Sequence, residues 1–362
     1  MSDSTHALAP DDVVRTHEEA GAQEREALLV LEPLLAFLDE RGIGAGEPAI
    51  APIGDGHSNH TFLLTRSDRS VVVRRPPRGP IPPSAHDVLR EARVIAAVGA
   101  HGVRVPAVLA VGDDPATIGA PFFVMEAVEG EVITAAVPVA LDAPDQRRAL
   151  SFELVDALVE LHAVDWEAAG LAGFGKPTGY TERQVRRFLG LWDVNKTREI
   201  PEVERVAAWL TGNLPESPRA TIVHGDYRLG NVMYARGAPA RLNAILDWEM
   251  STIGDPLADV GYLCMMWSQA DDPSGGLMDL NAVTRGDGFP TRAELVARYE
   301  EGSGRTVRDI RWYTALALWK SIVFMEGNVK RAASGLSDDP FLKDFGDGVV
   351  DLARRAEAVT RG

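Results

Sequence analysis

The first third of the chain alternates between short apolar runs and polar turns, which is typical of β-strands. Residues 61–64 (TFLL) and 71–73 (VVV) are apolar runs separated by the polar turn 66–69 (RSDR), and together they predict a β-hairpin. Residues 121–126 (PFFVME) predict another strand, and the glycine-containing turn 54–59 (GDGHSN) precedes the hairpin. We therefore expect a small β-sheet in this part of the chain.

A helix is predicted from about residue 85 to 98, because apolar residues recur there at helical spacing. Glu91 falls inside the apolar arc of this helix. A carboxylate on a buried face needs a partner, because an unpaired buried charge is strongly unfavourable. The alternative is a carboxylate at the helix edge that reaches water.

Helical spacing dominates after about residue 128. Examples of this spacing are Leu154, Leu158 and Leu161, and later Leu316, Trp319 and Val323. Long loops are expected at about 130–145 and 268–290. An earlier helix, from Glu24 to about Arg41, is predicted to end before Gly42. The chain is thus strand-rich first and helix-rich afterwards.

Composition narrows the class of protein. The chain has 362 residues, 45% of them hydrophobic, and a formal net charge of -16. This charge disfavours binding to nucleic acid or to an anionic membrane surface, since such binding needs Lys and Arg. The single cysteine, Cys264, rules out a disulfide within the chain and a cysteine-based zinc site, and we expect it in the core.

The first 20 or so residues are polar and acidic, and they predict a loose tail rather than a signal peptide. No apolar stretch reaches the roughly 18 residues of a membrane span. The expected location is the cytoplasm. The oligomeric state does not follow from the sequence.

The strongest chemical signal is residues 222–234 (IVHGDYRLGNVMY), where two apolar runs flank a polar centre. This pattern predicts a hairpin-like loop that presents polar side chains between two buried strands. Asp226 and Asn231 are five residues apart in it. Kinase catalytic loops have the same spacing, with the Asp accepting the hydroxyl proton and the Asn holding a metal ion.

A second signal follows, where the apolar run 244–246 (AIL) ends in Asp247. Phosphoryl transfer needs a hard cation on the nucleotide phosphates, and Mg²⁺ prefers oxygen ligands. Asp247 lies sixteen residues after Asn231, which is enough for one short hairpin that would bring the two side chains together.

The order and spacing of these motifs resemble the aminoglycoside phosphotransferase and choline kinase branch of the protein-kinase-like fold. The resemblance is closer still to the kinase-like domains associated with acyl-CoA dehydrogenases. It covers about residues 45–335 and rests on 74–77 (RRPP), 83–87 (PSAHD), 224–226 (HGD) with Asn231, 247–249 (DWE) and 254–259 (GDPLAD).

The resemblance implies a two-lobed α+β fold, with a small antiparallel-sheet lobe and a mainly helical large lobe. The implied boundaries are a flexible tail at 1–22, a nucleotide-covering lobe at 23–128 and a lobe at 129–362 with the catalytic loop, metal and acceptor site. ATP and Mg²⁺ are expected between the lobes.

The resemblance also implies the role of each site residue. Asp226 is the base that orients or deprotonates the acceptor hydroxyl, while Asn231 and Asp247 bind Mg²⁺. The resemblance implies three nucleotide-binding features. A phosphate-covering turn contains Gly54, Gly56, Ser58 and Asn59. A basic residue, Arg74, pairs with the helix carboxylate Glu91, and a hinge that meets adenine contains Glu126 and Val128.

Two features depart from the family pattern. The third strand carries Arg74 beside Arg75 where the family usually has Lys, and the sequence leaves open which arginine faces the nucleotide. The turn 54–59 is not a full G-x-G-x-x-G. Around the catalytic loop, we expect His224 to hold the loop by packing and hydrogen bonding.

Three other acidic side chains lie near these motifs. Asp255 and Asp259 are expected to bond backbone amides. Glu249 is expected either to line the acceptor site or to lie behind the metal ligands.

The predicted function is transfer of the γ-phosphate of ATP to a hydroxyl of a small molecule. Three hypotheses about the function remain open. The preferred one is a hydroxylated acyl-CoA or another metabolic alcohol, because of the closer resemblance to the dehydrogenase-associated domains. The second is an aminoglycoside-type antibiotic, and the third is a nucleotide-binding pseudokinase with no acceptor.

Overall fold

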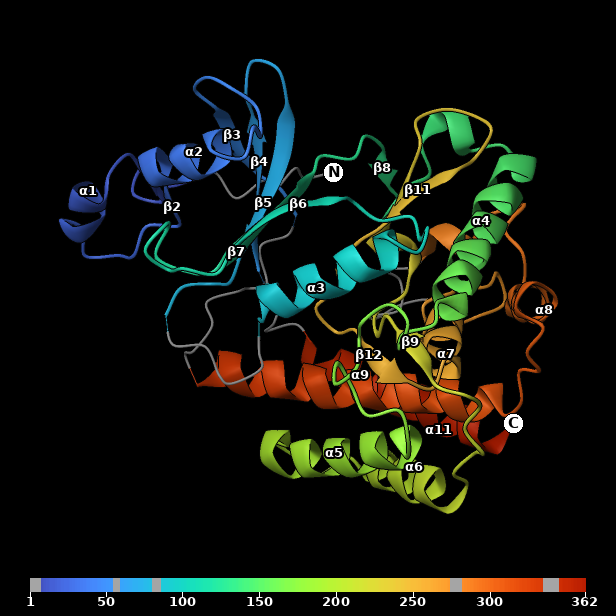
Figure 1. Cartoon of the computed structure of the whole chain (residues 1–362). Helices are drawn as coiled ribbons and strands as arrows, with labels where there is room; N and C mark the ends of the chain where they lie inside the picture. Colours follow the sequence, from blue (N-terminus) through green and yellow to red (C-terminus); the bar gives the residue numbers. More distant parts are fainter. Residues whose placement is uncertain (1–7, 55–58, 80–85, 274–281, 335–344) are drawn as a thin grey trace. The chain divides into compact units, whose positions relative to one another are not determined.

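A computed structural model describes residues 8–54, 59–79, 86–273, 282–334 and 345–362. Its internal contacts divide the chain into two compact units, which we call unit 1 (Met1–Glu129) and unit 2 (Gly130–Gly362). Unit 1 is built around an antiparallel sheet and unit 2 is mainly helical, as the α+β prediction requires (Figure 1).

The sheet of unit 1 has five strands, and every pair of neighbours in it is antiparallel. The predicted hairpin is confirmed, since the second and third strands along the sheet pair over six residues each. In spatial order the strands are β3 (Ala49–Pro52), β4 (His60–Thr65), β5 (Ser70–Arg75), β7 (Phe122–Glu126) and β6 (Val108–Gly112).

Two helices cover opposite faces of this sheet. Helix α2 (Leu31–Asp39) packs Leu34 and Leu38 against one face, where Phe62 and Val73 lie. Helix α3 (Val88–Gly99) lies against β6 and β7 and begins at Asp87, whose side chain accepts a hydrogen bond from the Arg90 amide at 2.9 Å. Because side chains alternate along a strand, Arg74 and Arg75 of β5 point to different faces.

The predicted helix from Glu24 to Arg41 is wrong at its start. Only Leu31–Asp39 is helical, and Leu29–Val30 forms the short strand β2, which pairs in parallel with β1 (Val13–Val14). The backbone carbonyls of Ala27 and Leu28 accept hydrogen bonds from Arg75 at 3.1 and 2.8 Å. Those carbonyls are therefore held by a long-range contact rather than by a helix.

The stretch predicted to be a loose tail also contains structure. Besides β1, helix α1 (His17–Gly21) forms there, with the Thr16 side chain accepting a hydrogen bond from the Glu19 amide at 3.2 Å. Residues 8–22 are thus part of the described fold of unit 1.

In unit 2, the long helix α9 lies among four other helices (Figure 1). Trp312 and Trp319 of α9 donate indole hydrogen bonds to the backbone of α6 at 3.1 and 3.2 Å, which fixes the two helices against each other. The helices are α4 (Pro144–Ala163), α5 (Tyr180–Asn195), α6 (Pro201–Gly212), α7 (Leu257–Met265), α8 (Arg292–Ser303), α9 (Ile310–Ala333) and α11 (Phe345–Arg361).

Two small antiparallel sheets complete unit 2. In the first, β10 (Val232–Tyr234) pairs with both β11 (Leu242–Ile245) and β8 (Glu131–Val132). In the second, β9 (Thr221–Val223) pairs with β12 (Thr252–Gly254). The strands that flank the catalytic loop, β9 and β10, therefore belong to different sheets, so the predicted hairpin-like loop is wrong in its pairing.

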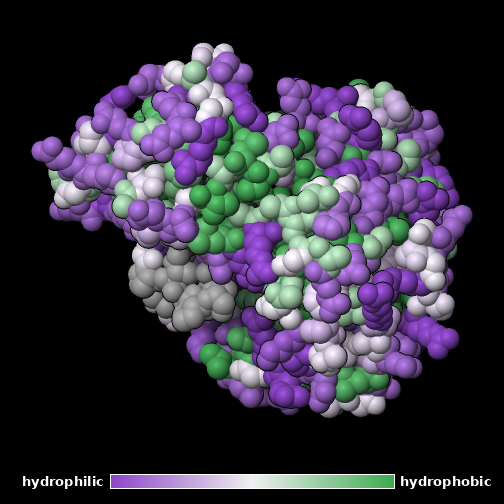
Figure 2. Space-filling view, viewed as in Figure 1, coloured by the Kyte–Doolittle hydropathy of each residue, from purple (hydrophilic) through white to green (hydrophobic). Residues whose placement is uncertain are grey.

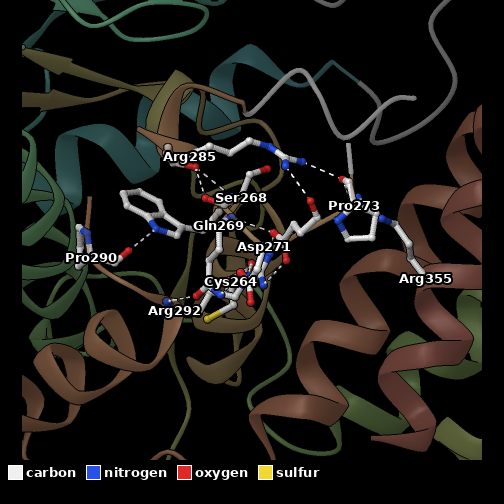
Figure 3. Close-up of polar contacts among 12 residues, drawn as sticks. Cys264, Ser268, Gln269, Asp271, Pro273, Arg285, Pro290, Arg292 and Arg355 are labelled. Atoms are coloured by element: carbon white, nitrogen blue, oxygen red, sulfur yellow. Dashed lines mark hydrogen bonds and ion pairs between the residues drawn. The ribbon is translucent and has the colours of Figure 1, made fainter. Parts of the chain in front are cut away.

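Polar contacts brace the segment between α7 and α8 (Figure 3). Arg292 donates to the Cys264 carbonyl at 2.9 Å and makes two hydrogen bonds to Asp272. Arg285 and Arg355 both donate to the Pro273 carbonyl at 2.8 Å. The ends of the predicted loop 268–290 are thus tied to α7, α8 and α11. Cys264 itself is buried, as predicted, and burial raises the pKa of its thiol to about 12.

The surface is largely hydrophilic on the face shown in Figure 2, with hydrophobic side chains gathered over the sheet of unit 1 near β6 and β7. Val111 of β6 is 44% exposed, and its neighbours Leu109 and Ala110 are half-buried. Among the described helices, none has the length and apolar character needed to cross a membrane.

Candidate active site

The loop that carries Asp226 begins where β9 ends. Gly225 has a φ of 89°, and a Cβ atom there would lie 2.6 Å from the Met250 carbonyl oxygen. Only glycine satisfies both conditions, because side chains disfavour positive φ and because the space is taken by backbone. The chain therefore turns sharply just before Asp226.

His224 supports this loop and does not act as its base. Its ring is fully buried and packs against Trp248, with ring centroids 4.9 Å apart. Nε2 lies 2.9 Å from the Leu246 carbonyl and Nδ1 lies 3.3 Å from the Asp226 amide. With Nε2 donating and Nδ1 accepting, both ring nitrogens are occupied, and the predicted holding role is confirmed.

Asp259 of α7 fixes the backbone of the same loop. Its two carboxylate oxygens accept hydrogen bonds from the amides of His224 and Gly225 at 2.7 and 2.8 Å. The His162 Nε2 lies 3.2 Å from Oδ2, and the His162 Nδ1 lies 2.8 Å from the Tyr299 hydroxyl. Asp255 similarly accepts from the Leu257 amide at 2.9 Å. The prediction that both aspartates bond backbone amides is confirmed.

Replacing Asp259 with Asn is expected to lower the free energy of unfolding by about 3 kcal/mol, because an amide nitrogen would face backbone donors in a buried site. Burial alone would raise the pKa of Asp259, but its contacts with His162, His224 and Gly225 hold that pKa below 3.8. A lowered pKa stabilises the fold above the unfolded-state value and loses that contribution as the pH falls through the folded-state value.

Urea denaturation of wild type and Asp259→Asn at neutral pH and near pH 3 measures both effects. The difference between the two proteins should shrink in acid. Asp156→Asn is a matched control, because that carboxylate pairs with Arg298 at the surface, and it should change the midpoint little. Equal midpoints for all three proteins would contradict the assigned role of Asp259.

The carboxylate of Asp226 is oriented by Asn231 and also lies beside the Tyr262 hydroxyl. Asn231 donates from Nδ2 to Oδ2 of Asp226 at 2.7 Å and to its backbone carbonyl at 2.9 Å. Among the described residues, none hydrogen-bonds to Oδ1. The nearest cation recorded there is Arg228, whose Nε lies 3.6 Å from Oδ1. This arrangement orients Asp226 and leaves Oδ1 buried without a hydrogen bond among the described residues.

Asp247 lies next to Asn231 through the β10–β11 hairpin. The Leu246 amide donates to the Asn231 carbonyl at 2.8 Å, so the hairpin predicted from the sixteen-residue spacing is confirmed. Asp247 has a φ of 62°, an unusual conformation for a residue with a side chain. Backbone strain of this kind recurs at functional sites.

The donor set at this hairpin fits Mg²⁺. Asn231 uses its amide nitrogen towards Asp226, which leaves its amide oxygen, and Asp247 supplies a carboxylate. No group of three or more His, Cys, Asp or Glu side chains that could hold a metal occurs among the described residues. Mg²⁺ in nucleotide sites needs only one or two protein ligands beside phosphate and water.

Two more side chains of unit 2 are influenced electrostatically by Asp226. Burial, and then the Asp226 carboxylate, raises the pKa of Tyr262 well above 10. Burial, and then Arg187, lowers the pKa of Lys320 to about 8, against the opposite effect of Asp259 and Asp226. The sequence alone did not predict the roles of Tyr262, Lys320, His162 and Tyr299, because each lies on a helix far from the loop in sequence.

In unit 1, Arg74 forms the ion pair with the helix carboxylate. Its Nε lies 2.9 Å from Oε2 of Glu91, which is 2% exposed, and its Nη1 donates to the Thr61 hydroxyl at 3.1 Å. The predicted pairing of Glu91 is confirmed. Asn59 also donates to the Glu91 carboxylate, at 3.4 Å.

Arg75 serves the fold instead. Its guanidinium is fully buried on the other face of the sheet, where it donates to the carbonyls of Ala27, Leu28 and Pro76 and to Glu26. Because side chains alternate along β5, Arg74 lies on the face with Glu91 and Arg75 lies on the opposite face.

Glu91→Gln is expected to destabilise the protein by about 3 kcal/mol, because it leaves the Arg74 charge without its carboxylate in a largely buried position. Urea denaturation measures this change. Glu40→Gln is the control, since Glu40 pairs with Arg41 while 76% exposed, and it should have little effect. If Glu91→Gln were as stable as that control, the ion pair would contribute nothing to the fold.

The remaining residues predicted to bind the nucleotide lie at or beyond the ends of β3 and β7. Gly54 has a φ of 82° at the end of β3, whereas Gly56 and Ser58 lie outside the described residues. Glu126 ends β7, and its amide donates to the Ala107 carbonyl at 2.9 Å. Among the described residues, the backbone amide of Val128 has no partner, so it is available to a ligand.

Residues 49–313 match the family described as the phosphotransferase enzyme family. The chain belongs to this family. The predicted resemblance is thereby confirmed at the level of the family.

Relatives of this family member include parts of much longer proteins. The chain is 33% identical over 307 residues to acyl-CoA dehydrogenase family member 10 of Mus musculus, a match that covers 83% of this chain and 28% of that protein. It is 30% identical over 321 residues to acyl-CoA dehydrogenase family member 11 of Homo sapiens, covering 85% of this chain and 40% of that protein. The chain thus spans less than half the length of these relatives.

Solved structures confirm the kinase-like fold of the phosphotransferase. A protein of Ralstonia eutropha, provisionally named an aminoglycoside phosphotransferase, superposes with a TM-score of 0.77 at 29% identity over 92% of this chain and 98% of that one. An aminoglycoside phosphotransferase, APH(4)-Ia, in ternary complex with ADP and hygromycin B gives a TM-score of 0.57 at 14% identity over 90% of this chain and 97% of that one.

Proposed function

We propose that this phosphotransferase moves the γ-phosphate of ATP to a hydroxyl group of a small metabolic alcohol, with a hydroxylated acyl-CoA as the preferred acceptor class. The observation that carries the proposal is the orientation of Asp226, whose Oδ2 is fixed by Asn231 while Oδ1 is kept for the acceptor hydroxyl, 3.6 Å from the Arg228 Nε. A general base for a hydroxyl needs that geometry.

In this proposal Oδ1 of Asp226 accepts a hydrogen bond from the acceptor hydroxyl. This hydrogen bond orients the hydroxyl oxygen towards the γ-phosphorus. The oxygen–phosphorus bond to the acceptor forms as the bond between the γ-phosphorus and the bridging oxygen of ATP breaks. The hydroxyl proton passes to Asp226, and ADP leaves. Phosphoryl transfer depends mainly on such positioning and on charge stabilisation.

Mg²⁺ would be held by Asn231 and Asp247 and would neutralise charge on the phosphates. In unit 1, Arg74 would donate to phosphate oxygens while Glu91 keeps its guanidinium oriented. The free Val128 amide is suited to an adenine ring nitrogen, and the turn that includes Gly54 and Asn59 would cover the phosphates. A structure of an aminoglycoside 2'-phosphotransferase of the same fold contains GDP, so GTP belongs in the test as well.

The acceptor class rests on the relatives. Their names link this chain to acyl-CoA dehydrogenases, whose substrates are acyl thioesters. A macrolide 2'-phosphotransferase and APH(4)-Ia are 20% and 14% identical to this chain, so they support the fold alone. The second candidate is an aminoglycoside-type acceptor, favoured by the name of the Ralstonia protein.

The test is ATP and GTP consumption by the purified protein with amino sugars, short hydroxy acids and the CoA thioesters of hydroxy acids, with the phosphorylated product identified by mass spectrometry. Phosphorylation of a hydroxyacyl thioester supports the proposal. Transfer only to amino sugars would replace the acceptor class, and nucleotide binding without transfer to any acceptor would make the protein a pseudokinase.

A further inference from the structure

A lysine near the proposed base has a positive charge but no acidic partner. Lys320 of α9 is half-buried, and its Nζ lies 5.0 Å from the centroid of the Phe188 ring on α5. Among the described residues, no carboxylate lies within ion-pair distance of Lys320 and no group accepts a hydrogen bond from it. Asp226 and Asp259 are the acidic groups whose charge reaches it.

Both of those carboxylates are already used. Asp259 accepts from two backbone amides and from His162, and Asp226 is oriented by Asn231. The contact with Phe188 compensates only part of the cost of removing an ammonium group from water, since cation–π contacts are individually modest. That cost appears as the lowering of the Lys320 pKa to about 8.

The other charges near Lys320 add to the positive potential. Arg187 of α5 is near enough to lower the Lys320 pKa, and Arg228 lies beside Asp226. Both arginines repel a cationic acceptor. An acceptor that carries a negative group would be attracted by these cations.

Apolar side chains adjoin the same lysine. The rings of Phe188 and Phe324 meet edge to face with centroids 5.1 Å apart, and Phe324 is 41% exposed although it is large and hydrophobic. Leu189, the next residue of α5, is 37% exposed. A ligand at Lys320 would therefore contact a cation and aromatic surface together.

We propose that Lys320, with Arg187, forms an anion-binding subsite for the acceptor, and that the exposed ring of Phe324, which packs on the buried Phe188, binds the hydrocarbon part of the same molecule. The acceptor would then be a hydroxyl compound with a carboxylate or phosphate group, not a polyamine. This inference rests on the proposed function, because it assigns the acceptor class to the site of Asp226. Lys320 is a specificity-determining residue in this scheme.

The test compares acceptors that differ in charge alone. Lactate is compared with uncharged lactamide, and glycerol phosphate with uncharged glycerol. Comparing the two pairs shows whether a carboxylate or a phosphate is the preferred anion. Choline is the cationic acceptor. For Lys320→Met we expect KM for the preferred anion to rise about 10-fold or more, because a charge-assisted contact is lost. KM for the uncharged partner and for ATP should stay within about 2-fold.

Lys330→Met is the matched control, since Lys330 is an exposed lysine of the same helix, and it should leave every KM unchanged. Lys320→Arg should keep most of the preference for anions. Equal changes for charged and uncharged acceptors, or a preference of the wild type for choline, would overturn the subsite.

A binding measurement separates this proposal from the proposed function. If the wild type transferred phosphate to no acceptor, the transferase assignment would fail, but titration with glycerol phosphate or lactate would still test the subsite. Binding of the anion should raise the pKa of isotope-labelled Lys320, followed by nuclear magnetic resonance, because a negative charge favours the ammonium form. No change in that pKa at saturating anion would refute the subsite.

Discussion

Asp226→Asn is expected to lower kcat on the order of 100-fold or more while the affinity for ATP changes only a few-fold. The asparagine keeps an oxygen that can accept the hydrogen bond from Asn231, so the loop should hold its shape. What it loses is the charge and the proton-accepting oxygen at the position of Oδ1. The loss should therefore appear in turnover rather than in nucleotide binding.

The measurement is steady-state kinetics with the best acceptor, together with calorimetric titration of ATP. Asp193→Asn provides a control, because Asp193 is an exposed carboxylate of α5, and it should behave as the wild type. A rate near that of the wild type for Asp226→Asn would show that Asp226 only supports the loop. The family and fold assignments would stand in that case.

Asp247→Ala is expected to abolish measurable turnover and to weaken the binding of Mg-ATP, because it removes the one carboxylate of the proposed metal site. Asp247→Asn separates two effects. Asparagine tolerates the left-handed φ of 62° about as well as aspartate does, whereas alanine adds roughly 1–2 kcal/mol of strain. Both variants should lose Mg-ATP affinity, but only the alanine should lose stability as well.

Asp309→Ala is a control for strain, since Asp309 has a φ of 55° directly before α9 and is not one of the proposed metal ligands. It should lose stability and keep activity. Calorimetry of ATP with and without Mg²⁺ gives the affinity, and thermal denaturation gives the stability. Unchanged Mg-ATP affinity in Asp247→Ala would remove Asp247 from the metal site.

The sequence predicted those features that depend on neighbouring residues. The five-residue spacing of Asp226 and Asn231 and the following hairpin were readable because the partners are close along the chain. The helical wheel was enough to place Glu91 on a buried face, but it did not choose between Arg74 and Arg75. That choice needed the register of β5 in the sheet, which orients one arginine to α3 and the other to the segment before α2.

Structural features that depend on tertiary contacts were either not predicted from the sequence or predicted wrongly. His162 meets Asp259 across 97 residues and Tyr299 across 137 residues, and no local pattern records such pairs. The segment before α2 has helical composition, yet the buried Arg75 takes its carbonyls. The role of Lys320 was not predicted for the same reason. In the sequence it is one polar residue of a long helix, and only the packing of α5 against that helix shows its contact with Phe188.

The chain of contacts from Tyr299 through His162 and Asp259 to the amides of His224 and Gly225 has a consequence for biosynthesis. The loop with Asp226 is translated long before the helix that supplies Tyr299. Its backbone amides can be fixed only after α7 and α8 have left the ribosome and docked on α4. A nascent chain that has passed residue 247 therefore contains every proposed catalytic and metal-binding side chain, but the loop is not yet locked in its final shape.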